Sequence, residues 1–245
     1  MAGQKQEAGK FAKFLLGKKA LKIANNEAEY FTLKSGRKSP VFVNAGSLID
    51  GSSLLGLAEG YADKIAGLLA KGQIEDFDYI FGPAYKGIPL AALACAMLFK
   101  KHKISKKFLY DRKEEKLHGD VKADAIIVGA NQFAQGGKIL MIDDVITTGA
   151  AKFEAYEKLK VLGNFKLVGV LVAIDRQECG GDASTANAGA ADEIKQKLGC
   201  PLYAIATMGE LYSSLAPTLP EGQAAGWRKY FAKWGTEEAK KWAGE

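Results

Sequence analysis

The sequence predicts an α/β fold in which a mostly parallel sheet is covered by helices on both faces. Apolar segments rich in Val, Ile and Leu alternate with helical segments, and they lie at 78–82, 106–110, 138–143, 166–175 and 201–207. These segments lack the polar alternation of a sheet with one wet face, so we expect both of their faces to be buried. The chain has 245 residues, of which 48% are hydrophobic, and this suits a single domain with a substantial core.

The composition narrows the range of partners. Lys and Arg total 34 against 28 acidic residues, a net charge of +6 that favours anionic ligands or reflects a basic surface. No nucleic-acid-binding module accompanies this charge, so we expect no nucleic-acid partner. The three cysteines, Cys95, Cys179 and Cys200, are too widely spaced for a disulfide framework or a zinc site. Without an apolar run of membrane-span length or a signal-peptide core, we expect a cytoplasmic protein and no membrane partner.

The N-terminal part is expected to hold two helices around a small β structure. Residues 7–24 carry apolar side chains at helical spacing among lysines. Residues 30–46 mix aromatic and β-branched residues around a Ser-Gly turn, which predicts a hairpin or short meander. Residues 52–72 predict a helix that Ser52 or Ser53 caps and Gly72 ends.

Further helices are expected at 87–101, with a proline in the first turn, and at 150–163, where a glycine ends the helix. The long polar and Gly-rich stretch after residue 110 is typical of a functional or disordered loop. Within it, residues 125–129 are expected to add one strand of a hairpin. Near the C-terminus, residues 226–242 predict a helix with one aromatic face that docks onto the domain or onto a second subunit.

The run ILMIDDVITTG (139–149) carries the most chemical information. Asp143 and Asp144 stand together at a predicted strand end, where ligands of open α/β sheets bind. The following TTGAA (147–151) enters a helix and is expected to form an anion cradle from hydroxyls and free N–H groups. Acids followed by such a cradle predict a phosphorylated sugar as ligand. The alternative is a Thr-capped helix beside two solvated acids.

This run resembles the phosphoribosyl-pyrophosphate (PRPP) binding motif of type I phosphoribosyltransferases. Four more segments resemble orotate phosphoribosyltransferases and occur in that family's order: FTLKSGRKSPVFVNAG, FGPAYKGIPLA, YDRKEEKLHG and AIDRQE. The resemblance implies a type I phosphoribosyltransferase fold in a single domain, 1–245. It has a small hood (about 1–50 plus C-terminal segments), a core (about 51–207) and a long flexible lid loop (about 111–137).

The resemblance also implies which residues bind PRPP. Asp143 and Asp144 face the ribose hydroxyls, and the loop after them holds the 5′-phosphate. Four cations of the lid, Arg112, Lys113, Lys116 and His118, meet the departing pyrophosphate. Lys116, Asp143, Asp144, His118 and Arg112 are the candidate catalytic residues. The remaining candidate PRPP ligands are Lys34, Tyr85, Lys86, Val145, Ile146, Thr147, Thr148, Gly149, Ala150 and Ala151.

Orotate is flat and anionic, so its pocket needs an apolar wall and cations. The resemblance implies that Lys34, Phe42, Val43, Thr147 and Arg176 form it, and a planar guanidinium suits the orotate carboxylate. The chain departs from the family in two places. Phe42 is followed by valine where two adjacent aromatic residues are common, and the stretch between 118 and 138 looks longer than in compact bacterial enzymes.

The implied activity is that of a pentosyltransferase in pyrimidine (UMP) biosynthesis, which converts orotate and PRPP to orotidine 5′-monophosphate (OMP) and pyrophosphate. Mg²⁺ is the implied cofactor, bound mainly through PRPP or pyrophosphate and water rather than by protein ligands. A lid that works on the neighbouring subunit implies a homodimer. Two alternatives remain: a phosphoribosyltransferase for uracil or a purine, and a PRPP-sensing or nucleic-acid-binding regulator on the same fold.

Overall fold

The structure, a computed structural model, describes residues 2–112, 126–146 and 150–244, without the side chains of 2–6, 146 and 150. Within this part of the chain, six strands form the central sheet in the order β10-β9-β8-β5-β6-β7. Their bounds are β5 (Tyr79–Gly82), β6 (Lys107–Asp111), β7 (Ile127–Val128), β8 (Gly137–Ile146), β9 (Phe165–Asp175) and β10 (Leu202–Thr207). All neighbours pair in parallel except β6 and β7. The predicted α/β class is confirmed.

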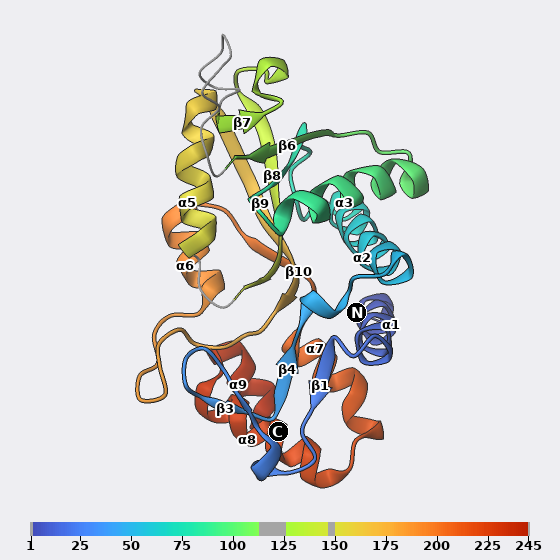
Figure 1. The fold of residues 1–245 in the computed structure, drawn as a ribbon, viewed down its shortest axis with the longest axis vertical. Helices are drawn as coiled ribbons and strands as arrows, with labels where there is room; N and C mark the ends of the chain where they lie inside the picture. The colour runs from blue at the N-terminus through green and yellow to red at the C-terminus, as the bar shows by residue number, and fades with distance from the viewer. Residues whose placement is uncertain (1, 113–125, 147–149, 245) are drawn as a thin grey trace.

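Helices cover both faces of this sheet (Figure 1). Helices α2 (Gly51–Ala70) and α3 (Gly87–His102) lie on one side, and α5 (Ala150–Leu159) and α6 (Ala190–Leu198) lie on the other. Strand β8 shows why both faces are covered, because its successive side chains point to opposite faces of the sheet. Ile139 and Met141 join the core under α5 and α6, whereas Leu140 and Ile142 join the larger core under α2 and α3. Within the described residues, no helix is long and apolar enough to span a bilayer.

The first predicted helix, 7–24, is wrong at its end. Helix α1 (Ala2–Gly17) stops early, and Lys19 adopts a left-handed conformation with φ +55°. The chain then enters strand β1 (Leu21–Ile23), which pairs antiparallel with β4 (Val41–Val43). A short β partner therefore overrides the helical spacing of the sequence. The predicted hairpin within 30–46 is present as β2 (Phe31–Thr32) and β3 (Lys38–Ser39).

Helix α2 is capped two or three residues earlier than predicted. Asp50, not Ser52 or Ser53, is the N-cap, and its carboxylate accepts the Ser53 N–H at 2.9 Å. Ser53 Oγ accepts the Asp50 N–H at 3.1 Å, which completes a capping box. Gly72 ends the helix as predicted, with φ +61°.

Part of the long stretch after β6 packs onto the sheet. Strand β7 pairs with β6 as a hairpin, with Val128 opposite Tyr110. A short 3₁₀ turn (Ala130–Gln132) follows, and the Phe133 ring lies 4.8 Å from that of Tyr79. Residues 126–137 of the predicted lid therefore pair with or pack against the sheet, and residues 113–125 of the predicted lid lie outside the described residues.

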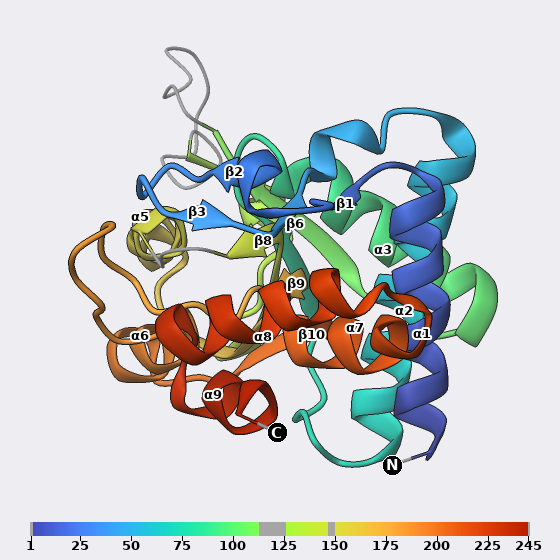
Figure 2. The same ribbon diagram turned by 90° about the horizontal axis from the view of Figure 1, so that it is seen from below.

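The C-terminal aromatic helix is two helices in the structure. Helix α8 (Glu221–Trp234) ends before Gly235, and Thr236 caps α9 (Glu237–Ala243). Trp227 and Phe231 are fully buried in the main core, so the predicted docking is onto the same chain. Helix α7 (Met208–Leu215) lies between them and α1, as Figure 2 shows.

Segments from the N-terminal and C-terminal parts of the chain meet in the lower part of Figure 1, where strands β1, β3 and β4 lie beside α7, α8 and α9. Arg37 joins these parts, since its buried guanidinium lies 4.4 Å from the Trp234 ring centroid. The same guanidinium donates to four carbonyl oxygens of the loop after β9, those of Cys179, Gly180, Asp182 and Thr185. The division into hood, core and lid stays a prediction.

Replacing Arg37 should therefore destabilise the protein. We expect Arg37→Met to lower the free energy of unfolding by about 3 kcal/mol, because it removes the hydrogen bonds that the buried guanidinium donates to four carbonyl oxygens. Urea denaturation of both proteins measures the difference. Lys38→Met, at the exposed neighbouring position, is the control and should change stability little. Equal stability of the Arg37→Met protein and wild type would contradict this role.

Candidate active site

Two carboxylates at the end of β8 occupy different environments. Asp143 is buried and points toward α5, where its Oδ2 forms an ion pair with Lys152 Nζ. Its Oδ1 accepts the backbone N–H of Asp144 at 2.9 Å. Both Asp143 oxygens are therefore engaged by the protein itself. Burying two ions costs several kcal/mol in lost hydration, which close pairing must offset.

Asp144 instead faces a cavity. Its Oδ2 lies 2.9 Å from Lys86 Nζ, and this hydrogen bond and charge raise the pKa of Lys86. Lys86 follows β5 and Asp144 lies near the end of β8, the two strands at which the sheet order reverses direction. The crevice beyond such a reversal is where open α/β sheets bind ligands. The pair therefore marks the expected position of a ligand.

The end of β8 is also fixed from the other face of the sheet. The Tyr61 hydroxyl of α2 donates to the Asp143 carbonyl oxygen at 2.7 Å. Tyr61 is fully buried, and burial raises the pKa of its hydroxyl well above the usual value. The proton that this hydrogen bond needs is therefore retained.

The backbone of the turn FGPAYKG, between β5 and α3, is tightly packed. A Cβ at Gly82 would lie 2.7 Å from the backbone carbon of Gly87 and 2.8 Å from Ala91 Cβ. A Cβ at Gly87 would lie 2.9 Å from the Ile142 carbonyl oxygen. Both glycines are thus required by the backbone packing of the turn, and this packing places Lys86 opposite Asp144.

A buried carboxylate joins this turn to two further segments. Asp111, at the end of β6, accepts the Ala84 N–H and pairs with Lys158 of α5 at 2.8 Å. Lys158 also donates to the Arg112 carbonyl oxygen at 3.0 Å. The network therefore holds the turn, α5 and the beginning of the predicted lid in one arrangement.

The cavity in front of Asp144 has a volume of about 780 Å³. It brings together seven residues that the sequence singles out, and these are Lys34, Phe42, Val43, Lys86, Asp144, Val145 and Arg176. They come from the β2–β3 turn, from β4, from the end of β8 and from the segments that follow β5 and β9. Residues distant in the sequence thus form one site.

Other predicted residues lie elsewhere or outside the described residues. Asp143 lies behind the cavity wall, and Tyr85 is exposed beside it. Arg112 is half-buried where β6 ends. Lys113, Lys116, His118, Thr147, Thr148 and Gly149 lie outside the described part of the chain. The side chains of Ile146 and Ala150 are also not described, and Ala151 is exposed at the start of α5.

The lining of the cavity includes an aromatic ring and a partly buried arginine. The Phe42 ring packs against Phe31 at a centroid distance of 5.6 Å, which supplies a second aromatic side chain behind it. Arg176 Nη2 pairs with Glu178 Oε1 at 2.6 Å. Burial raises the pKa of Glu178, although the Arg176 charge opposes this shift. Arg176 Nε is buried and finds no acceptor among the described residues.

The loop that carries this arginine is held by the C-terminal helices. Where α8 ends, Trp234 accepts the Cys179 N–H at 2.9 Å, and Thr236 donates its N–H to Gln177 at 2.9 Å. The Gln177 side chain in turn accepts the Gly209 N–H at 2.9 Å. The break between α8 and α9 therefore exposes backbone groups that fix the cavity wall.

Sequence reasoning missed three residues that shape the site. Lys152 had one available signal, since a lysine in the first turn of a helix opposes the helix dipole. Glu178 lies inside a quoted motif but was given no role. Arg37 carries no local signal, because its partners lie more than a hundred residues away.

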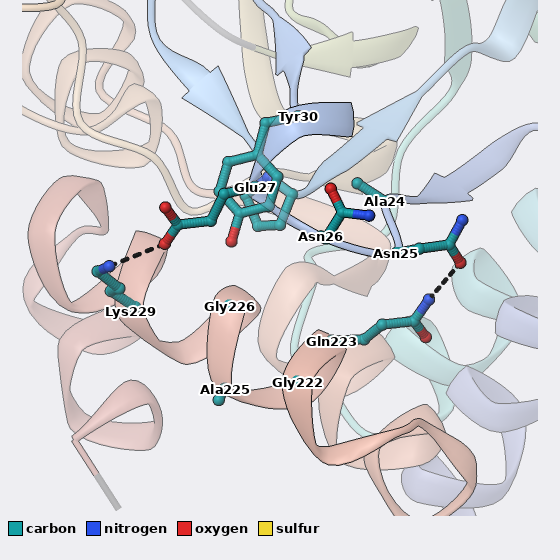
Figure 3. Close-up of a pocket in the computed structure, with 11 residues that line it drawn as sticks. Ala24, Asn25, Asn26, Glu27, Tyr30, Gly222, Gln223, Ala225, Gly226 and Lys229 are labelled. Atoms are coloured by element: carbon teal, nitrogen blue, oxygen red, sulfur yellow. Dashed lines mark hydrogen bonds and ion pairs between the residues drawn. The ribbon is translucent and has the colours of Figure 1, made fainter.

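A second cavity of about 320 Å³ lies between residues 24–30 and α8 (Figure 3). The Glu27–Lys229 ion pair at 2.9 Å and the Gln223–Asn25 hydrogen bond at 3.1 Å join its two sides. Its lining includes no residue that the sequence singles out as functional. These two contacts connect the N-terminal segment to α8.

Comparison with known proteins identifies the family, although no family model matches the chain. A protein of Bifidobacterium adolescentis named orotate phosphoribosyltransferase is 40% identical over 206 residues, 84% of each chain. One of Acinetobacter baumannii with the same name is 44% identical over 206 residues, 84% of this chain and 88% of that one. The chain belongs to the orotate phosphoribosyltransferase family.

The solved structures agree with this membership. The crystal structure of orotate phosphoribosyltransferase from Francisella tularensis matches with a TM-score of 0.75 at 35% identity. The match covers 92% of this chain and 99% of that one. Among residues 2–112, 126–146 and 150–244, no group of three or more His, Cys, Asp or Glu is placed to hold a metal ion.

The glycine turn gives a direct test of the site's construction. We expect Gly82→Ala to destabilise the protein by about 3 kcal/mol, because a methyl group there must displace backbone and not a flexible side chain. Thermal unfolding measures this, and PRPP binding should weaken in parallel. Gly67→Ala is the control, since nothing lies within 4 Å of a Cβ there. It should be neutral or stabilise α2 by up to about 1 kcal/mol.

Proposed function

We propose that this protein transfers the 5-phosphoribosyl group of PRPP to N1 of orotate, giving OMP and pyrophosphate in pyrimidine (UMP) biosynthesis. The observation that carries the proposal is the single cavity that joins Asp144 and Lys86 to Phe42 and Arg176. The first two are candidate PRPP ligands and the last two are candidate orotate ligands. Relatives named orotate phosphoribosyltransferase that cover most of the chain support the same activity.

The reaction needs positioning more than covalent catalysis. Orotate N1 attacks C1′ of the ribose while the bond to pyrophosphate breaks, and positive charge develops on the sugar. We propose that Asp144, which faces the cavity, holds the ribose hydroxyls and stabilises that charge. We assign no enzyme nucleophile. The loop from Thr147 to Ala151 holds the 5′-phosphate in this proposal.

The base pocket is suited to a flat anion. Phe42 offers a ring face, and Lys34 lines the same cavity as a cation. Arg176 has a buried Nε without an acceptor among the described residues, so a carboxylate ligand would satisfy it. Uracil lacks that carboxylate and would leave the donor unpaired, and this favours orotate over the uracil alternative.

Pyrophosphate carries several negative charges as it leaves. Lys86 lines the cavity, and Arg112 lies near the turn that carries Lys86. Both side chains are cations and are suited to bind pyrophosphate. We propose that Lys113, Lys116 and His118 complete this set in the closed enzyme. Mg²⁺ is proposed to arrive on PRPP, bound mainly through its pyrophosphate and water, and it would offset charge on the leaving group.

The deciding experiment follows orotate absorbance in a mixture of protein, PRPP, Mg²⁺ and orotate. We expect orotate to be consumed and OMP and pyrophosphate to form in equal amounts. Omitting Mg²⁺ should suppress the reaction, and adding it back should restore it. Turnover of uracil or a purine in place of orotate would support another base. PRPP binding without turnover of any base would favour a regulator.

Arg176 allows a sharper test of base recognition. We expect Arg176→Met to raise KM for orotate about 100-fold while changing KM for PRPP little, because a charge-assisted pair contributes about 3 kcal/mol. Steady-state kinetics with each substrate varied measures the split. Arg228→Met on α8 is the control, since Arg228 pairs with Glu221 away from the cavity. Equal rises in both KM values would remove the assigned role.

We further propose a homodimer in which each lid serves the partner's site. Mixing inactive Lys116→Ala and Asp144→Asn proteins should then restore about a quarter of wild-type activity, because half of the dimers are hybrids with one intact site. Mass spectrometry confirms subunit exchange. Hybrids that form without any recovery of activity would show that each lid serves its own site.

A further inference from the structure

We infer that Lys152 is a positioning residue that divides the acid pair into two roles. It locks Asp143 as a buried support, so that Asp144 alone is the carboxylate presented to the ribose of PRPP. This inference rests on the proposed function, because it assigns PRPP to the cavity at Asp144.

The contacts form a chain from the core to the cavity. Lys152 pairs with Asp143 Oδ2, and Asp143 Oδ1 holds the Asp144 N–H at 2.9 Å. The Asp144 side chain then meets Lys86 at the cavity. Side-chain exposure follows the same order, with 5% for Lys152, 10% for Asp143 and 15% for Asp144. Removing the Lys152–Asp143 ion pair should therefore loosen the backbone that orients the Asp144 side chain.

The position of Lys152 is unfavourable for a lysine unless it has this partner. It lies in the first turn of α5, where the helix dipole disfavours a cation. Its ammonium is also removed from water. The Asp143 carboxylate offsets both costs. Lys158 near the end of α5 and Lys160 just after it contact different acids.

The charge balance also suits a polyanionic substrate. Two adjacent unpaired carboxylates would repel PRPP from the crevice. Lys152 offsets Asp143 and Lys86 offsets Asp144, so the four side chains sum to zero charge. A ligand that displaces Lys86 toward its phosphates then frees only Asp144 for the ribose, because Lys152 stays buried with Asp143.

Lys152 also fixes the two ends of the segment proposed to hold the 5′-phosphate. Asp143 precedes this segment and Lys152 follows it, so their ion pair ties the end of β8 to the start of α5. The ion pair therefore fixes the positions of Asp143 and Lys152 relative to each other.

A double-mutant cycle tests the inference. PRPP affinity is measured by calorimetry for wild type, Lys152→Met, Asp143→Asn and the double variant, with kcat and both KM values. We expect Lys152→Met to weaken PRPP binding about tenfold and to leave KM for orotate unchanged, a coupling typical of contacting residues. Adding Asp143→Asn should cause no further loss and should recover part of the affinity, because it removes the unpaired buried charge.

Controls separate positioning from general damage. Lys160→Met, which breaks an exposed pair with Glu157, should leave PRPP affinity at the wild-type value. Thermal unfolding shows whether each variant is folded. If Lys152→Met does not fold, Lys152→Gln and the neutral pair Lys152→Gln with Asp143→Asn take its place in the cycle. Asp144→Asn should weaken PRPP binding more than Asp143→Asn does.

The outcomes are distinct. Additive losses in the double variant would show that Lys152 contacts PRPP directly, and unchanged affinity in Lys152→Met would show a purely structural pair. Either result overturns the inference while wild-type binding and turnover leave the proposed function intact. Failure of wild type to bind PRPP would overturn the proposed function and, with it, this inference.

Discussion

The site depends on keeping two adjacent carboxylates at the end of a buried strand. Repulsion between them would destabilise the strand end, and the protein limits it by giving each acid its own lysine. Lys152 comes from the helix that follows β8, whereas Lys86 comes from a turn more than fifty residues earlier. The folds of the turn, the strand and α5 are therefore mutually dependent, since each places a charge that the others require.

Sequence reasoning recovered the features that are local. The apolar strands, their burial on both faces and the segments that line the cavity can be read from runs of neighbouring residues. Asp50 was not predicted as the N-cap because the sequence alone does not show whether the acid or a nearby serine caps the helix. Lys152 and Glu178 were not predicted because their importance follows from their burial, which the sequence does not show. Arg37 escaped because four backbone carbonyls of a distant loop leave no pattern in the sequence.

The two halves of the cavity are built in different ways. The half at Asp144 rests on the central sheet, so its geometry follows from strand pairing. The half at Arg176 rests on a loop that Arg37 and the C-terminal helices hold from outside the sheet. The half of the cavity at Arg176 is therefore supported by segments from both the N-terminal and the C-terminal parts of the chain.

The glycine turn between β5 and α3 has a consequence for how such an enzyme can change. A Cβ at Gly82 or Gly87 would lie less than 3.0 Å from backbone atoms, so almost no variation is open to this turn. Phe42 and Val43 meet the cavity through side chains, and these can be exchanged without moving the chain. Altered base preference, whether by natural drift or by engineering, should therefore arise around β4 while the phosphate-side turn stays constant.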